Sequence, residues 1–384
     1  MADWETGGFG LYIHWPFCEA KCPYCDFNSH VAAKIDQSAW RQAYLSEIQR
    51  IASETPDRVV QSVFFGGGTP SLMAPETVAE ILESVQTHWP VANDIEVTLE
   101  ANPSSVEKDR FAAYRAAGVT RVSIGVQALN DADLKRLGRL HSGAEAREAI
   151  ETAQTTFDRM SFDLIYARQG QSLSDWRAEL TDALCLGADH LSLYQLTIEP
   201  GTAFGARHAK GMLRDLPNED LSADMYELTQ ELCEAAGKPA YETSNHAGDM
   251  GASRHNLIYW RSGDWAGIGP GAHGRLTIDG SRYATETPPS PSAWLTQVHQ
   301  VGHGEAPRHA LTPIEHGEEM LMMGLRLTEG VSISRFRNVS GVDLSAAAIS
   351  ELSDLGLISL NGDRLATTAK GRPVLNGILR QILA

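Results

Sequence analysis

Short apolar runs alternate with longer amphipathic segments over the first 200 residues of the chain. Six of the runs have the length and composition of strands. They are Gly10–Trp15, Gln61–Phe65, Ile95–Glu100, Arg121–Val126, Phe162–Tyr166 and His190–Leu196. Between the runs, apolar residues recur at helical spacing, as Trp40, Tyr44, Ile48 and Ile51 do. The predicted helices are Ser38–Ala52, Pro75–Trp89, Val106–Ala117, Ala144–Thr155 and Ser174–Leu186.

This alternation of strand and helix predicts an α/β fold. Strands joined through helices form right-handed crossovers and a parallel sheet. Six such units are too few for a complete eightfold barrel, so we expect a partial (β/α)6 barrel. Because ligands bind at the C-terminal ends of the strands in such sheets, we expect the functional site there.

The pattern changes after Pro200. Glu219–Ala236 is predicted as one more amphipathic helix, and Tyr241–Gly274 is polar, aromatic and rich in glycine. Thr285–Ala293 is expected to be a proline-rich linker or loop.

The end of the chain has the features of a small separate domain. An Asn361-Gly362 pair between two short apolar runs predicts a β-hairpin, and short helices precede it. We therefore expect a core over residues 1–237, a connecting region over 238–312 and a winged-helix-like α+β tail over 313–384. Winged helices often bind DNA, but the charge of the chain favours a packing or partner role for this tail.

The charge and the composition limit the function. The chain carries 49 acidic and 32 basic residues, a net charge of -17, which argues against a general nucleic-acid binder. No apolar run reaches the roughly 18 residues of a membrane span, and the first residues do not resemble a signal peptide. Five cysteines are too few for a disulfide scaffold, so a cytoplasmic protein is expected.

Three cysteines near the N-terminus form the strongest motif. Cys18, Cys22 and Cys25 follow the first predicted strand with C-x3-C-x2-C spacing. A [4Fe–4S] cluster held by three thiolates keeps one iron open, as radical S-adenosylmethionine (SAM) chemistry requires. The alternatives are unliganded cysteines or a structural zinc with a fourth ligand from His14, Asp26 or His30. Cys185 and Cys233 lie on apolar faces of predicted helices and are expected to be buried thiols.

With this cysteine motif and the motifs given below, the chain resembles the coproporphyrinogen-oxidase-like branch of the radical SAM superfamily, and within it the HemW-type haem chaperones. The resemblance covers nearly the whole chain. Besides the cysteine motif, it is carried by Tyr12-Ile-His-Trp-Pro-Phe-Cys18, Gly66-Gly67-Gly68-Thr69-Pro70, Glu100-Ala-Asn-Pro103, Ser123-Ile-Gly-Val-Gln127, Phe162-Asp-Leu-Ile-Tyr166 and His255-Asn-Leu-Ile-Tyr-Trp260.

The glycine-rich Gly66–Pro70 segment follows the second predicted strand. Glycines let the backbone approach a ligand closely, and the segment lacks the Lys-Ser/Thr of a phosphate-binding loop. The resemblance implies that Gly67, Gly68 and Thr69 contact the amino end of SAM. The alternative is an ordinary tight turn.

Polar and aromatic residues near other strand ends complete the predicted cofactor site. The resemblance implies SAM contacts for Glu100, Gln127, Arg139 and Asp163, and implies that Tyr12 and Tyr24 cover the cluster and the adenine. Arg139 could pair with the SAM carboxylate. The alternatives are a solvated strand end for Glu100, a surface ion pair for Arg139 and core positions for the tyrosines.

The His255-Asn-Leu-Ile-Tyr-Trp260 motif suggests a haem site. A neutral imidazole can ligate haem iron, and Tyr and Trp can line a porphyrin face. The resemblance ties this motif to haem handling, which makes His255 the candidate ligand. The alternative is a histidine that packs the barrel mouth. His246 and His273 are weaker candidates.

The chain departs from the oxidases in two ways. The oxidases carry a further cysteine two positions after the third, and this chain has Phe27 there. The oxidases also carry a long segment before the first strand, whereas here that segment is short. Both departures favour the chaperone branch over the oxidases. The resemblance implies a haem chaperone that binds a cluster, SAM and haem, that can form a homodimer, and that delivers haem to an acceptor such as a respiratory haem protein. The rivals are a coproporphyrinogen III dehydrogenase, another radical SAM enzyme such as a C-methyltransferase, and a structural zinc protein. The sequence assigns no catalytic residue.

Overall fold

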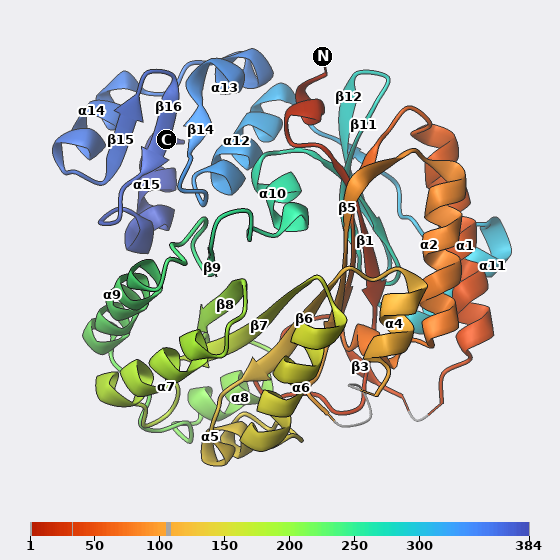
Figure 1. Cartoon of the computed structure of the whole chain (residues 1–384). Helices are drawn as coiled ribbons and strands as arrows, with labels where there is room; N and C mark the ends of the chain where they lie inside the picture. Colours follow the sequence, from red (N-terminus) through yellow and green to blue (C-terminus); the bar gives the residue numbers. More distant parts are fainter. Residues whose placement is uncertain (1, 33, 105–108, 384) are drawn as a thin grey trace.

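The computed structural model describes residues 2–32, 34–104 and 109–383 (Figure 1). Its main feature is an open, curved sheet in the order β13-β12-β11-β10-β1-β4-β5-β6-β7-β8-β9. The central strands run parallel. They are β10 (Asp264–Ile268), β1 (Phe9–Trp15), β4 (Val60–Gly67), β5 (Val91–Ala101), β6 (Arg121–Gln127), β7 (Arg159–Tyr166) and β8 (His190–Gln195). The six predicted strands and the partial barrel are confirmed.

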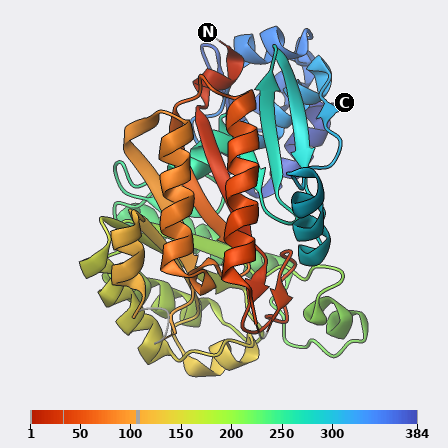
Figure 2. The same cartoon turned by 90° about the vertical axis from the view of Figure 1, so that its right-hand side faces the viewer.

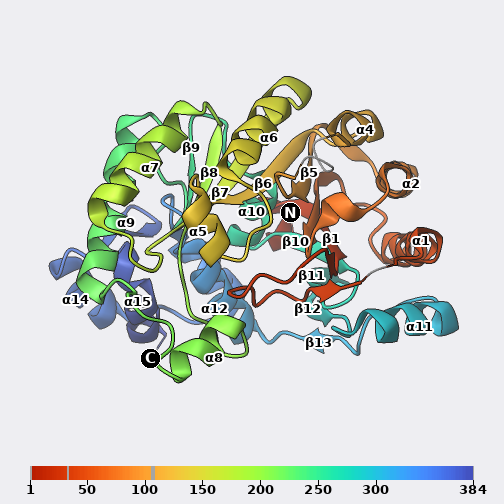
Figure 3. The ribbon, with the colours of Figure 1, turned by 90° about the horizontal axis from the view of Figure 1, so that it is seen from below.

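Helices cover the outside of this sheet, as the view from below shows (Figure 3). They are α1 (Gln37–Glu54), α2 (Pro75–His88), α4 (Phe111–Ala117), α6 (Gly143–Thr156), α7 (Leu173–Cys185) and α9 (Glu219–Ala235). Capping boxes begin α6 at Ser142 and α7 at Ser172, because each serine and the acid three residues later satisfy free N–H groups. Helix α4 ends at Ala117, as predicted, and Gly118 caps it with a φ of 108°. The predicted start of this helix at Val106 lies outside the described residues.

The region after α9 extends the sheet. The short β9 (Asn245–Ala247) pairs with β8, and α10 (Arg254–Trp260) leads into β10, which lies beside β1. The antiparallel strands β11 (His273–Ile278), β12 (Ser281–Glu286) and β13 (His309–Ala310) follow. The proline-rich segment is only partly a loop, because Glu286 ends β12 and Pro291 begins α11 (Pro291–Val301).

Strand β10 is not among the six strands that the sequence predicts. This strand is short and begins with a buried acid, so its pattern is not that of an apolar run. Asp264 is compensated by ion pairs with Arg58 at 3.0 Å and with Arg282 at 2.7 Å. Such pairing allows a charged group inside a sheet. Because the partners are distant in sequence, the local pattern around Asp264 does not reveal them.

The C-terminal tail has a hydrophobic core of its own. Its helices are α12 (Pro313–Gly324), α13 (Ile333–Ser340), α14 (Ala346–Asp354) and α15 (Leu375–Ile382), and its sheet has the order β14 (Val331–Ser332), β16 (Arg364–Thr367), β15 (Ile358–Asn361). The winged-helix-like prediction and the hairpin are confirmed, although the two loop residues are Gly362 and Asp363. The tail lies at the end of the molecule opposite β3 (His30–Val31) (Figures 1 and 2).

Two further expectations concern the remaining cysteines. Cys233 is buried, as predicted, and burial raises the pKa of its thiol to about 12. The prediction for Cys185 is wrong, because this residue is exposed at the last position of α7. The buried face of α7 contains Trp176, Leu180 and Ala183, and Cys185 lies off that face. Among the described residues, no helix has the length and apolar character needed to span a membrane.

Candidate functional site

The cysteine loop crosses the mouth of the barrel at the C-terminal ends of the strands (Figure 3). It leaves β1 through the short strand β2 (Phe17–Cys18), which pairs in parallel with β3. Asn28 attaches the loop to the other side of the mouth, because its side-chain amide donates to the carbonyls of Pro270 and Pro289, both at 2.9 Å. The loop is therefore held at both ends.

The three thiols are half-buried and have defined neighbours. The Thr69 hydroxyl donates to Cys18 Sγ at 3.4 Å, and Arg139 Nη1 donates to Cys22 Sγ at 3.3 Å. The Cys25 Sγ lies 3.9 Å from the Ser29 hydroxyl. Donors aimed at sulfur favour the thiolate that ligates iron, although burial outweighs them in the ligand-free protein and raises the pKa of Cys18 and of Cys25.

This donor set fits an iron–sulfur cluster better than one zinc ion. Sulfur ligands of a single tetrahedral zinc lie about 3.8 Å apart, given a Zn–S distance of about 2.3 Å. In the part of the chain that the structure describes, no three His, Cys, Asp or Glu side chains are grouped to hold one metal ion. A four-iron cluster places each cysteine on a different iron and keeps the thiols further apart.

A cavity of about 140 Å³ lies against the three cysteines. It brings together most of the residues that the resemblance assigned to SAM. These are Tyr24, Gly67, Gly68, Thr69, Glu100, Gln127, Arg139 and Asp163. Their SAM contacts stay a prediction, but strands β4 to β7 and the cysteine loop place them around one space. Arg139 is no surface ion pair, since its guanidinium also donates to Asn102 Oδ1 at 2.6 Å and to the Gly125 carbonyl at 2.7 Å.

The backbone around this cavity requires small residues and unusual torsion angles. Gly67 has a φ of 114°, which favours glycine, and a Cβ at Gly68 would lie 2.7 Å from the Phe17 carbonyl oxygen. Gln127 ends β6 with a φ of 71°, rare for a residue with a side chain. Such strain is concentrated at functional sites, which supports a ligand role for this strand end.

Two carboxyl groups, those of Glu100 and Asp163, line the same cavity. Burial and the nearby Asp163 raise the pKa of Glu100 to about 8, although the Gly67 amide donates to Glu100 Oε2 at 3.1 Å. Burial also raises the pKa of Asp163 to about 6. A cationic ligand in the cavity would favour the ionised form of both groups.

Replacement of Glu100 by glutamine is expected to change how stability depends on pH. The folded protein keeps the Glu100 proton up to about pH 8, whereas the unfolded chain releases it near the ordinary value of 4.5. The free energy of unfolding of the ligand-free protein should therefore fall as pH rises from 4.5 to 8, by roughly 2–4 kcal/mol. Glu100→Gln should remove most of this slope in urea unfolding at several pH values. The exposed Glu227→Gln control should keep it, and an unchanged slope in Glu100→Gln would contradict the assignment.

A second, larger cavity of about 490 Å³ adjoins the first. Phe27, Gly67 and Glu100 line both spaces. The other lining residues come from the cysteine loop, β1, α10, β10, β11 and α12. They are Tyr12, His14, Asn28, Tyr259, Trp260, Trp265, Gly271, His273 and Met323. Tyr12 therefore belongs to this second cavity and does not line the space beside the cysteines.

His255 lies beneath the wall of the second cavity. Its ring is 2% exposed and lies 4.9 Å from the Phe64 ring, in a stacked arrangement. His255 Nδ1 bonds the Ser62 hydroxyl at 2.8 Å, and Nε2 bonds the Tyr259 hydroxyl at 2.6 Å. Burial lowers the pKa of His255 to about 3, so the ring is neutral and both nitrogens are engaged. In this conformation His255 offers no free lone pair to iron and packs inside the barrel.

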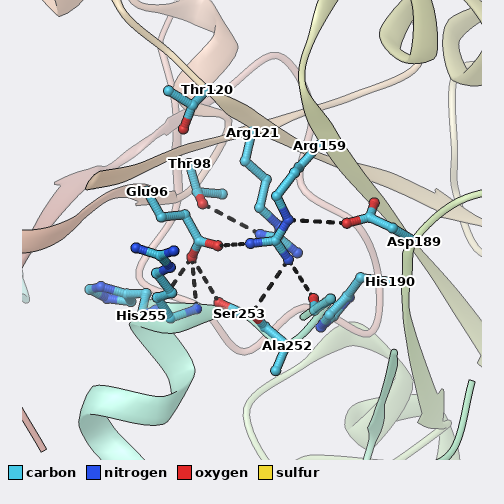
Figure 4. A network of polar contacts seen from close by, with 12 residues as sticks. Glu96, Thr98, Thr120, Arg121, Arg159, Asp189, His190, Ala252, Ser253 and His255 are labelled. Atoms are coloured by element: carbon cyan, nitrogen blue, oxygen red, sulfur yellow. Dashed lines mark hydrogen bonds and ion pairs between the residues drawn. The ribbon is translucent and has the colours of Figure 1, made fainter. Parts of the chain in front are cut away.

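A buried polar network holds α10 in place (Figure 4). Glu96 on β5 forms an ion pair with Arg159 on β7 at 2.6 Å. Its other oxygen accepts from the backbone N–H groups of Arg254 at 2.9 Å and His255 at 3.4 Å. These are first-turn N–H groups, which have no partner within the helix. The network therefore attaches the helix that carries the His255–Trp260 motif to the barrel wall.

Several residues of the first cavity were not selected from the sequence. Asn102, Ser123 and Gly125 line it, and Asn102 also donates to the Thr69 hydroxyl at 3.2 Å. All three lie within the motifs that carried the resemblance. Their position directly after or within a predicted strand end was the signal that could have identified them.

Comparisons with known proteins agree with this fold. A model of the Radical SAM superfamily matches residues 12–183, and a model of the HemN C-terminal domain matches residues 311–374. The solved structure of coproporphyrinogen III oxidase (HemN) from Escherichia coli superposes with a TM-score of 0.80 at 21% identity, over 98% of this chain and 90% of that one. The fold and the cysteine-lined cavity define a radical SAM protein.

Curated relatives narrow the class. The heme chaperone HemW of Escherichia coli is 38% identical over 97% of this chain and 98% of its own length. The mitochondrial radical S-adenosyl methionine domain-containing protein 1 of Bos taurus is 39% identical over 97% of this chain and 87% of its own length. The chain belongs to the HemW family of radical SAM proteins.

Proposed function

We propose that this protein binds a [4Fe–4S] cluster, SAM and haem, and transfers haem to acceptor haem proteins. The observation that carries the proposal is the pair of adjoining cavities. One is small and polar and lies against three thiols, and the other is larger and mainly aromatic. The names of the curated HemW relatives support haem as the cargo.

The residues of the first cavity divide into two groups by chemistry. Cys18, Cys22 and Cys25 would hold the cluster, which when bound supplies an electron to SAM. Arg139 holds a positive charge beside Cys22 and can pair with a carboxylate. Glu100 and Asp163 can accept from an ammonium or from ribose hydroxyls.

The second cavity suits a large planar ligand. Its volume lies within the range of about 300–1,000 Å³ typical of small-molecule sites. Aromatic side chains line it, and such rings pack against planar ligands at low entropic cost. Phe27 lines both cavities and is 62% exposed. It occupies the sequence position at which the oxidases carry a further cysteine. This position favours a chaperone over a coproporphyrinogen III dehydrogenase.

An anaerobic haemin titration of the reconstituted protein, followed by addition of apomyoglobin, tests the proposal. We expect stoichiometric haem binding, transfer of the haem to apomyoglobin, and no vinyl product from coproporphyrinogen III in the presence of SAM and a reductant. Vinyl product without stable haem binding would instead support the dehydrogenase. The cytoplasmic location and the homodimer stay predictions, and the Bos taurus relative is named as mitochondrial.

A further inference from the structure

Three histidines lie in or beside the aromatic cavity, and they differ in the freedom of their ring nitrogens. His255 has both nitrogens engaged. His14 is also fully engaged, because Nδ1 bonds the Tyr12 hydroxyl at 3.1 Å and Nε2 bonds the Asn28 carbonyl at 2.9 Å. His273 lines the cavity from the start of β11, is exposed, and has no side-chain hydrogen bond within the described part of the chain. Only a ring with a free lone pair can bind iron.

The backbone of His273 is rigid, although its ring is free. The Trp265 indole donates to the His273 carbonyl at 3.1 Å. A Cβ at Gly267 would lie 2.2 Å from the same carbonyl oxygen, so only glycine allows this close approach of β10 and β11. Because the backbone is already fixed, only the side-chain torsions of His273 lose freedom when the ring binds a ligand.

The wall around His273 offers the other contacts that a haem needs. Tyr259, Trp260 and Trp265 give it an aromatic surface, and Met323 of α12 adds an apolar group. The Trp260 indole N–H is buried and has no hydrogen-bond partner among the described residues.

Resting on the proposed function, we propose that His273 ligates the haem iron. His255 is then a positioning residue that holds the Tyr259 hydroxyl, and with it one wall of the cavity. The site is also connected to the cysteine loop, because Asn28 bonds both His14 and the segment that precedes His273. Haem held there would lie in the cavity that adjoins the cluster site.

Haemin titrations of the full-length wild type, His273→Ala, His255→Ala and His208→Ala test this assignment. His208 is exposed on α8 (Ala203–Ala209), outside the cavity. In the ferrous state, resonance Raman spectra should show an Fe–His stretch in the wild type, in His208→Ala and in His255→Ala. His273→Ala should lack that stretch and regain an imidazole-ligated spectrum when free imidazole is added. Its dissociation constant for haemin should rise by roughly tenfold or more, a change of about 1.4 kcal/mol.

The outcomes separate this inference from the proposed function. Loss of the Fe–His signal in His255→Ala but not in His273→Ala would overturn the assignment while leaving the haem chaperone intact. A wild type that binds no haem would overturn both. Because His273 is exposed, His273→Ala should unfold at the wild-type temperature, so the spectra report ligation.

Discussion

Replacement of Cys22 by alanine is expected to remove the iron–sulfur cluster almost completely. A cluster with one open iron depends on three thiolates, and with two of them left it has no stable attachment. Arg139 Nη1 donates to Cys22 Sγ, so the change also removes one of the acceptors of a buried guanidinium. Iron analysis and the absorption near 400 nm of the anaerobically reconstituted protein measure the result, and SAM binding should be lost with the cluster.

The chain contains a matched control for this experiment. Cys185 is exposed at the end of α7, so Cys185→Ala removes a thiol without touching the cavity. This variant should reconstitute to the wild-type iron content. Equal iron content and absorption in Cys22→Ala and the wild type would refute the assignment of the cluster to this loop. A colourless wild type that binds one zinc ion would favour the structural zinc reading.

Replacement of Glu96 by alanine is expected to have the largest effect on stability. The change leaves Arg159 without its buried partner (Figure 4). It also removes the acceptor of the first-turn N–H groups of α10. Removal of one member of a buried ion pair costs about 3–5 kcal/mol. Arg159 keeps Asp189 at 3.1 Å and is itself 24% exposed, so we expect about 3 kcal/mol. Urea unfolding measures the loss, and hydrogen exchange should show α10 opening first.

Two further variants give this prediction its controls. Glu96→Gln keeps an oxygen acceptor for the backbone of Arg254 and should lose less stability than the alanine variant. Asp158 pairs with Arg115 on the surface at 2.8 Å, with side chains 63% and 40% exposed. Asp158→Asn should therefore cost only about 0–1 kcal/mol. A loss in Glu96→Ala no greater than in Asp158→Asn would show that the network does not stabilise α10.

Much of the barrel could be predicted because its signals are local. A parallel strand buried on both faces has a continuous run of apolar residues. In a helix on the outside of the sheet, apolar residues recur every three or four positions. The core of β1 from Phe9 to Trp15 illustrates the first pattern, and the buried face of α2, with Val78, Ile81 and Val85, illustrates the second. Cys185 shows where such reasoning fails, because a residue at a helix end need not face the core that the rest of the helix covers.

The sequence by itself determined the spacing of the cysteines, the order of the strands with polar residues at their ends, and the motifs that place the chain in its family. These depend on residues within a few positions of one another. Only the tertiary structure decided which histidine is free. Ser62 and His255 are 193 residues apart in the chain, yet they share a hydrogen bond inside the barrel. The binding capacity of an imidazole depends on such partners, and these are set by packing between elements that are distant in sequence.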